Sequence, residues 1–327
     1  MKKRPLIILT GPTAVGKTKA SIGLAKAVGG EIISADSMQV YRKMDIGSAK
    51  ITREEMDGVP HYLVDVLDPS EEFNVAFFQK MAKEAMEQIY ANGHIPIVVG
   101  GTGFYIQALL YDIDFTEGKE DDSVRSELEV FAAKHGAEKL HEMLREIDPK
   151  SAETIHANNV KRVIRAIEYY RQTGRPISEH NEVERQKESP YHFAYFVLMD
   201  DRQNLYDRIE KRIDLMLADG LLDEVKRLQE EGYTKDMVSM QGLGYKEILD
   251  YLNGDLTLEE AVYILKRDTR HFAKRQITWF RRERNVVWIH KNELNYDEDK
   301  ILEKMLHVLK EKEIIENGFI DKDDFTL

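Results

Sequence analysis

Residues 6–18 read LIILTGPTAVGKT, an apolar run of strand length that stops at Gly11 and continues as a helix from near Lys17. The spacing G-x-x-x-x-G-K-[ST] of a phosphate-binding loop is matched here by Gly11, Gly16, Lys17 and Thr18. Glycines let the backbone curl so that successive N–H groups point into one concavity, and the following helix adds the positive end of its dipole. We therefore predict a strand, a phosphate-binding loop and a helix, in preference to an ordinary glycine-rich turn with a surface lysine.

The predicted loop offers side chains as well as backbone N–H groups. Lys17 can reach phosphate oxygens as a point charge, and the hydroxyl of Thr18 is suited to Mg²⁺. We expect a di- or triphosphate to be held by the whole loop, which consists of Gly11, Pro12, Thr13, Ala14, Val15, Gly16, Lys17 and Thr18.

Length and composition exclude several classes of protein. The 327 residues suffice for one large or two modest domains. The absence of cysteine excludes disulfides, thiolate catalysis and cysteine-based zinc sites, and the ten histidines show no HExxH or similar spacing. No segment approaches 18 uninterrupted apolar residues, and the opening MKKRP runs directly into the predicted strand. We expect a cytoplasmic protein without a membrane segment or cleaved signal.

Charge is spread unevenly along the chain. The formal net charge of −12 argues against indiscriminate binding of nucleic acid. Residues 266–284 nevertheless contain eight Lys or Arg, among them Lys274 and Arg275, against two acidic residues. This basic strip (residues 266–284) is either a docking surface for a polyanion or a solvated helix face.

Polar residues follow two further strand-like runs. Asp36 comes directly after residues 31–35, and Thr102 lies in the glycine-rich turn 100–103, after the run 95–99. Ligands of open parallel sheets bind beyond the carboxyl ends of the strands, so Asp36 should lie on the same edge as Lys17 and accept a proton or hydrogen bond from substrate. The alternatives are a helix cap for Asp36 and an ordinary turn for Thr102. The run 95–99 lacks a terminal acidic residue, which argues against an ATP-driven motor.

The middle of the chain changes character. Residues 112–190 hold few strand-like runs and several short charged helices, one of them expected at 159–173 with Lys161, Arg162 and Arg165. This helix is a second polyanion contact or a plain surface helix. We predict an α/β fold with a P-loop NTPase-like parallel sheet flanked by helices. Its core comprises residues 1–115 and 190–327, and residues 116–189 form a helical insertion domain.

Two further expectations concern a short strand and a pair of arginines. Residues 62–67 are a candidate for another short strand. Arg208 and Arg212 are four residues apart on an expected helix, 204–217, and therefore share one face. They could clamp a pyrophosphate, or they could pair with Glu210 and Asp214 as surface charges.

Five stretches together closely resemble one family. They are GPTAVGKT (11–18), SADSMQVY (34–41), MDIGSAK (44–50), GGTGFY (100–105) and KRQITWFR (274–281). In this order they resemble the tRNA dimethylallyltransferases, also called tRNA isopentenyltransferases. Val15 stands where many members have Ser, and Phe104 where many have Leu. The zinc finger of eukaryotic members is absent, so the chain resembles the bacterial type.

The resemblance implies an enzyme that transfers a dimethylallyl group from dimethylallyl diphosphate to N6 of adenosine 37, next to the tRNA anticodon, with Mg²⁺. It implies catalytic roles for Lys17, Asp36, Thr102 and Arg212, with Asp36 taking the N6 proton and Arg212 holding the diphosphate. The implied contacts to the tRNA anticodon stem-loop are Asp36, Ser37, Met38, Gln39, Thr102, Arg125, Lys161, Arg162, Val163, Ile164, Arg165, Gly242, Leu243, Gly244, Tyr245, Lys246, Glu247, Lys274 and Arg275.

Two other functions remain as alternatives. A small-molecule or nucleoside kinase would share the phosphate-binding loop, but it would not require the second glycine turn or the basic helices. A non-catalytic RNA-binding protein would have no need of Lys17, Thr18 and Asp36 together. We expect the enzyme to act as a monomer.

Overall fold

The apolar run at residues 6–9 is the centre of a parallel sheet. The computed structural model describes residues 3–115 and 122–316, and within them one sheet has the strand order β3-β2-β4-β1-β5-β6, with every neighbouring pair parallel. Leu6 to Leu9 are at most 1% exposed, as expected of a strand covered on both faces. The strands are β1 (Pro5–Thr10), β2 (Gly30–Ser34), β3 (His61–Tyr62), β4 (Ile95–Gly100), β5 (His192–Met199) and β6 (Val286–His290).

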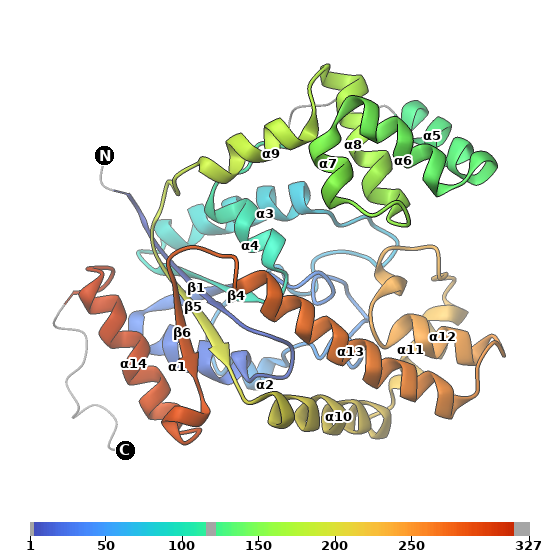
Figure 1. The fold of residues 1–327 in the computed structure, drawn as a ribbon. Coiled ribbons are helices and arrows are strands. Elements are labelled where there is room, and N and C mark those ends of the chain that lie inside the picture. The colour runs from blue at the N-terminus through green and yellow to red at the C-terminus, as the bar shows by residue number, and fades with distance from the viewer. Residues whose placement is uncertain (1–2, 116–121, 317–327) are drawn as a thin grey trace. The chain divides into compact units, whose positions relative to one another are not determined.

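Connections between the strands place helices on both faces of the sheet. The crossover from β1 to β2 runs in one direction along the sheet, and the crossover from β3 to β4 runs in the other. Because such crossovers are right-handed, α1 (Lys17–Val28) and α3 (Val75–Ala91) cover opposite faces, as Figure 1 shows. The direction reverses between β4 and β1, so the glycine turns after these two strands lie at the point where open α/β sheets bind their ligands.

Further helices of the same unit follow from recognisable start signals. α3 begins after Asn74, whose side chain accepts a hydrogen bond from the Phe77 N–H, and a capping box of Thr257 and Glu260 opens the long α13. The remaining helices of this unit are α2 (Arg53–Met56), α4 (Gly103–Leu110), α10 (Arg202–Ala218), α11 (Leu221–Glu230), α12 (Tyr245–Leu252), α13 (Leu258–Phe280) and α14 (Glu298–Glu311), with short 3₁₀ helices η1 (Ser239–Gln241) and η2 (Asn292–Leu294). No helix in the described ranges is long and apolar enough to cross a membrane.

A second compact unit consists of residues 110–189, and the first of 1–109 with 190–327. The second unit has its own apolar core, in which Leu128, Leu140 and Leu144 meet Val163 and Ile164. Its helices are α5 (Asp122–His135), α6 (Ala137–Ile147), α7 (Pro149–Thr154), α8 (Val160–Thr173) and α9 (Ile177–Gln186). Residues 116–121, where the sequence analysis begins the insertion, lie outside the described residues, so that boundary and the domain's role stay predictions.

Candidate active site

The phosphate-binding loop connects β1 to α1 and has a backbone that few residues could adopt. Gly11 has φ +150°, and a Cβ atom on it would lie 2.5 Å from the carbonyl oxygen of Leu198 in β5. Gly16 has φ +98° and precedes the first residue of α1. Ala14 is left-handed at φ +63°, which is unusual for a residue with a Cβ. Close packing and left-handed turns therefore explain both glycines of the motif.

Lys17 folds back over the loop. Its Nζ donates to the carbonyl oxygens of Gly11, at 3.0 Å, and Pro12, at 2.9 Å. Burial lowers the pKa of Lys17 to about 8, the nearby carboxylate of Asp36 favours the charged form, and the guanidinium of Arg212 opposes it. A buried cation with only neutral carbonyl partners is costly to keep charged, so an anion in the loop would stabilise it.

Asp36 reaches this charge cluster from the end of β2. Its Oδ1 accepts hydrogen bonds from the backbone N–H groups of Met38 at 2.8 Å and Gln39 at 3.3 Å, which turns the chain sharply after the strand. Asp36 therefore caps a turn and not a helix. Within the described part of the chain Oδ2 has no hydrogen-bond donor, so it can accept one from a substrate. The carboxylate of Asp36 interacts electrostatically with both Lys17 and Arg212, so the three charged groups lie near one another.

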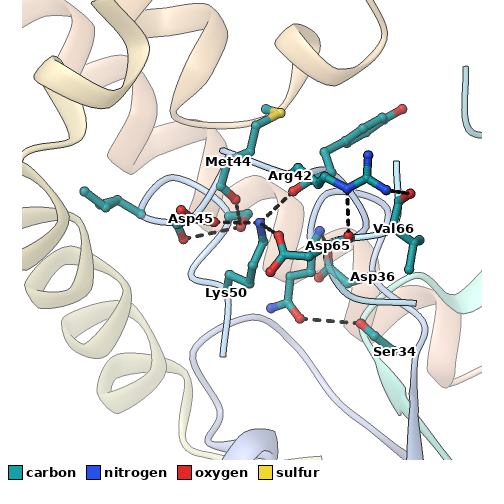
Figure 2. Close-up of polar contacts among 12 residues, drawn as sticks. Ser34, Asp36, Arg42, Met44, Asp45, Lys50, Asp65 and Val66 are labelled. Atoms are coloured by element: carbon teal, nitrogen blue, oxygen red, sulfur yellow. Dashed lines mark hydrogen bonds and ion pairs between the residues drawn. The ribbon is translucent and has the colours of Figure 1, made fainter. Parts of the chain in front are cut away.

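A network of charges fixes the segment after Asp36. Lys50, whose side chain is only 4% exposed, donates to the carboxylates of Asp45 at 2.7 Å and Asp65 at 2.5 Å, and to the carbonyl of Tyr41 at 2.6 Å. Arg42 holds the backbone carbonyls of Asp65 and Val66, and Figure 2 shows these contacts beside Asp36. These contacts therefore hold together residues 41–66, the segment that follows the turn at Asp36.

The second glycine turn, residues 100–103, packs too closely for larger side chains. A Cβ on Gly100 would lie 2.2 Å from the carbonyl oxygen of Ala35, and one on Gly103 would lie 2.2 Å from the ring of Trp279. The Thr102 N–H donates to the Ala35 carbonyl at 3.3 Å. This bond holds the backbone of Thr102 against the residue that precedes Asp36, and the catalytic role of Thr102 stays a prediction.

Gln276 of α13 joins the two glycine turns, and the sequence analysis missed it. Its Oε1 accepts from the Thr13 N–H at 2.8 Å, and its Nε2 donates to the Gly101 carbonyl at 3.0 Å. The side chain is buried. A glutamine between Arg275 and an apolar residue, on the buried side of a basic helix, is the signal that could have revealed it.

Two arginines of α10 contact the phosphate-binding loop, and the pyrophosphate clamp itself stays a prediction. Arg208 Nε donates to the Ala14 carbonyl at 2.8 Å, and Arg212 Nη1 lies 3.5 Å from the Thr13 hydroxyl. Burial lowers the pKa of Arg212, and the carboxylate of Asp36 opposes that shift. The alternative pairing was wrong, because the partners of Glu210 and Asp214 are Arg270 and Lys266, at 2.6 Å each.

The predicted Mg²⁺ site depends on Thr18, which is exposed in the first turn of α1. The described residues contain no cluster of three or more His, Asp or Glu that could hold an ion. Mg²⁺ commonly takes one or two protein oxygens together with substrate phosphates and water. A hydroxyl beside the loop fits that kind of site.

Segments 37–39 and 242–247, both expected to contact tRNA, pack against each other. A Cβ on Gly242 would lie 2.5 Å from Cε of Met38, and one on Gly47 would lie 2.6 Å from the ring of Tyr245. Tyr245 and Glu247 are at most 2% exposed. Their side chains therefore support the turn from inside and do not face an RNA, which corrects the expectation for these two residues. The other members of the two segments are half-buried, apart from Gly244, which is buried.

Glu224 of α11 was also missed, and it joins residues 45–47 to Tyr245. Its carboxylate accepts from the N–H groups of Asp45 at 3.0 Å, Ile46 at 2.8 Å and Gly47 at 3.0 Å, and from the Tyr245 hydroxyl at 2.8 Å. Burial and this carboxylate raise the pKa of Tyr245. An acidic residue on the apolar face of an amphipathic helix was the available signal.

The second unit holds the expected contacts on α5 and α8. Lys161 and Arg162 are exposed, whereas Val163 and Ile164 are buried in the core of the unit. The side chains of Val163 and Ile164 therefore cannot reach an RNA, a correction to the expectation from the resemblance. Arg125 and Arg165 share the buried carboxylate of Glu168, each at 3.1 Å, which holds these two arginines together.

Some cations of the basic strip are engaged in ion pairs within the protein. Lys266 and Arg270 pair with carboxylates of α10. Lys274 and Arg275 are exposed on α13 and line a hollow together with Thr278, Trp279 and Arg282. Cations beside an aromatic ring on a solvent-facing surface are suited to nucleic acid, because phosphate and base can be contacted together.

Comparisons with known proteins identify one family of enzymes. A family model described as IPP transferase matches residues 39–283, and one described as isopentenyl transferase matches residues 5–69. A tRNA dimethylallyltransferase of Lachnoclostridium phytofermentans is 63% identical over 95% of this chain and 99% of its own length. One from Acetivibrio thermocellus is 53% identical over 93% of this chain and 97% of its own.

Solved structures give the same result. The tRNA isopentenylpyrophosphate transferase of Bacillus halodurans superposes with a TM-score of 0.71 at 46% identity, covering 95% of this chain and 98% of that one. A eukaryotic dimethylallyltransferase acting on tRNA gives a TM-score of 0.76 at 30% identity, covering 88% and 74%. These matches support the α/β fold and not the kinase alternative. The chain belongs to the IPP transferase family, the enzymes named tRNA dimethylallyltransferases.

Proposed function

We propose that this enzyme transfers the dimethylallyl group of dimethylallyl diphosphate to N6 of adenosine 37 in the tRNA anticodon stem-loop. The observation that carries the proposal is the charge cluster at the ends of β1 and β2, where Lys17, Arg212 and Asp36 interact with one another. Two cations and a loop of N–H groups suit a departing diphosphate. A carboxylate with one unoccupied oxygen suits an amine that must lose a proton.

The bond changes follow from this arrangement. The bond between the allylic carbon and the diphosphate oxygen breaks, and a bond from N6 to that carbon forms. Negative charge that develops on the leaving diphosphate is stabilised by loop N–H groups, Lys17 and Arg212. Oδ2 of Asp36 accepts the proton that N6 loses. Adenine N6 is a weak nucleophile, so alignment by Asp36 and Thr102 contributes more than basicity.

Thr18 would hold Mg²⁺, which when bound supplies further positive charge to the diphosphate. The exposed Lys161 and Arg162 of the second unit, and Lys274 and Arg275 of the first, are suited to tRNA phosphates. Residues 37–39 and 242–244 are proposed to contact the flipped adenosine and its neighbours, since an adenine must leave the stack to react. We propose that the enzyme acts as a cytoplasmic monomer.

The deciding experiment follows labelled dimethylallyl diphosphate into an anticodon stem-loop with adenosine 37, with labelled ATP in parallel. Label should enter the RNA from the isoprenoid only, and a stem-loop with guanosine 37 should stay unlabelled. Transfer of the γ-phosphate of ATP to a small molecule would replace this proposal with a kinase.

The proton acceptor is tested by Asp36→Asn, with Asp57→Asn, an exposed carboxylate that pairs with Lys26, as a matched control. General acid–base catalysis is worth about 10²–10⁴-fold, so kcat should fall by that factor while the Kd for tRNA stays within about twofold. The control should keep full activity. An Asp36→Asn enzyme with unchanged kcat would remove this residue from the reaction.

A further inference from the structure

Two cations approach carbonyl oxygens of the phosphate-binding loop, at a place where neither the motif nor the family resemblance predicts a lysine. Arg208 holds the carbonyl oxygen of Ala14 at 2.8 Å, and Nζ of Lys291 lies 3.5 Å from the next carbonyl, that of Val15. Lys291 has a side chain only 3% exposed and pairs with Glu298 at 3.1 Å. The two cations thus take consecutive carbonyls of the loop.

The sheet brings Lys291 to this place. It follows β6, and its N–H donates to the carbonyl of Met199 at 3.0 Å, which extends the pairing of β6 with β5 by one residue. Because β5 in turn pairs with β1, the residue after β6 lies at the same edge as the loop after β1. A residue 276 positions away from Val15 in the chain is therefore fixed beside it by the strand register.

Both cations meet behind one glycine. A Cβ on Gly16 would lie 3.0 Å from Nζ of Lys291 and 3.4 Å from Nη2 of Arg208. Like charges so close together repel each other, and Glu298 balances only one of them. Such an arrangement is stable when it is compensated by aligned carbonyl dipoles and by negative charge nearby.

Peptide geometry gives these contacts a consequence for anion binding. A trans peptide group is planar, so its C=O and its N–H point in opposite directions. A carbonyl of Ala14 turned to Arg208 directs the Val15 N–H to the opposite side, where it donates a hydrogen bond to the Pro12 carbonyl at 3.4 Å and closes the loop. In the same way, a Val15 carbonyl turned toward Lys291 directs the Gly16 N–H inward. The left-handed Ala14, at φ +63°, would otherwise favour other orientations.

We propose that Lys291 is a positioning residue for diphosphate binding. With Arg208 it selects the orientation of two successive peptide groups, so that the Val15 N–H closes the loop on the Pro12 carbonyl and the Gly16 N–H faces the diphosphate. It acts through the loop and does not touch the substrate. The proposal rests on the proposed function for the identity of the anion, but the geometry requires only a diphosphate group.

The test measures the Kd for inorganic pyrophosphate with Mg²⁺ by calorimetry, and the Kd for tRNA separately. Lys291→Met should weaken pyrophosphate binding about tenfold, raise KM for dimethylallyl diphosphate by a similar factor, and leave tRNA binding and kcat at saturation unchanged. Lys291→Arg should restore most of the affinity. Lys300→Met, which removes an exposed lysine of α14 that also pairs with a carboxylate, is the matched control and should behave as wild type.

Thermal unfolding of each variant separates positioning from a purely structural role, which would lower the melting temperature without changing the Kd. If Lys291→Met does not fold, Lys291→Gln is measured in its place, with weakened pyrophosphate binding expected. Wild-type pyrophosphate affinity in a folded uncharged variant would overturn the proposal. A wild-type enzyme that binds pyrophosphate but does not modify tRNA would refute the proposed function and leave this inference standing.

Discussion

The phosphate-binding loop and the segment 44–50 are both curved so that backbone N–H groups gather on one side, but opposite charges hold them. In the loop, Lys17, Arg208 and Lys291 take the carbonyl oxygens. In the segment, the carboxylate of Glu224 takes three successive N–H groups. The first arrangement leaves N–H groups and positive charge for an external anion. The second already contains its anion.

This difference shows why glycines alone do not identify an anion site. Gly47 lies in the segment because the ring of Tyr245 leaves no room for a Cβ, and Gly16 lies in the loop because its φ of +98° is left-handed. What distinguishes the two is the sign of the side chains that approach the backbone from elsewhere in the fold. Surrounding cations indicate a binding site, and a buried carboxylate indicates internal support.

The largest effect should come from removing the ammonium inside the loop. Lys17→Met should lower kcat/KM for dimethylallyl diphosphate by about 10²–10³-fold, comparable with the loss of one preorganised donor to a transition-state oxyanion. Steady-state kinetics at saturating tRNA measure this. Lys19→Met, an exposed neighbour in α1, is the control. Equal losses in both variants would mean that Lys17 has no special place in the loop.

The next largest effect is expected in the pH dependence of pyrophosphate binding. Burial lowers the pKa of Lys17 to about 8, so the side chain is an ammonium below that pH and a neutral amine above it. Pyrophosphate affinity should therefore fall by up to tenfold per pH unit above about 8, as the attracting charge is lost. Lys17→Arg keeps its charge, so its profile reports the titration of the ligand alone. Parallel profiles for the two proteins would contradict the assignment.

A smaller effect is expected where the carboxylate holds the segment. Glu224→Gln leaves buried N–H groups short of an acceptor, so the free energy of unfolding should fall by about 1–3 kcal/mol. Affinity for tRNA should weaken by up to about tenfold, because the segment and Tyr245 support the turns at 37–39 and 242–244. Pyrophosphate affinity should stay at the wild-type value. Glu230→Gln, an exposed site on the same helix, is the control, and weakened pyrophosphate binding would show that the two regions are not independent.

The smallest effect is expected at the basic strip, which belongs to neither the phosphate-binding loop nor the segment 44–50. Changing Lys274 and Arg275 to Gln should reduce the slope of log Kd for tRNA against log salt by about 1.4–1.8, since two phosphate contacts no longer release counterions. Titrations at several salt concentrations measure the slope. The pair Lys300 and Lys304 on α14, changed in the same way, should leave it unaltered. An unchanged slope in the first variant would return the strip to a solvated helix face.

Local signals made much of the sheet predictable. The apolar run at 6–9 and its glycine loop needed no distant partner, and the end of β2 put Asp36 on the predicted edge because parallel strands end together. The strand expected at 62–67 was mostly wrong, since β3 is only His61–Tyr62. Leu63 and Asp65 are left-handed, and Arg42 holds the carbonyls of Asp65 and Val66 away from a neighbouring strand.

The missed site residues share a reason. Gln276, Glu224 and Lys291 each act on backbone groups far away in the sequence, and no spacing rule relates them to those groups. Their positions follow only from strand register and helix packing. The roles of the individual site residues and the boundary of the insertion stay predictions until they are measured.

The amide of Gln276 has a mechanical consequence. One helix carries the exposed Lys274 and Arg275 on its outer side and, on its inner side, the only amide among the described residues that grips both glycine turns. A rotation of α13 would displace both turns as one body. The phosphate-binding loop and the turn that carries Thr102 are therefore coupled through one side chain. A substitution that shifts one of these turns should also shift the other.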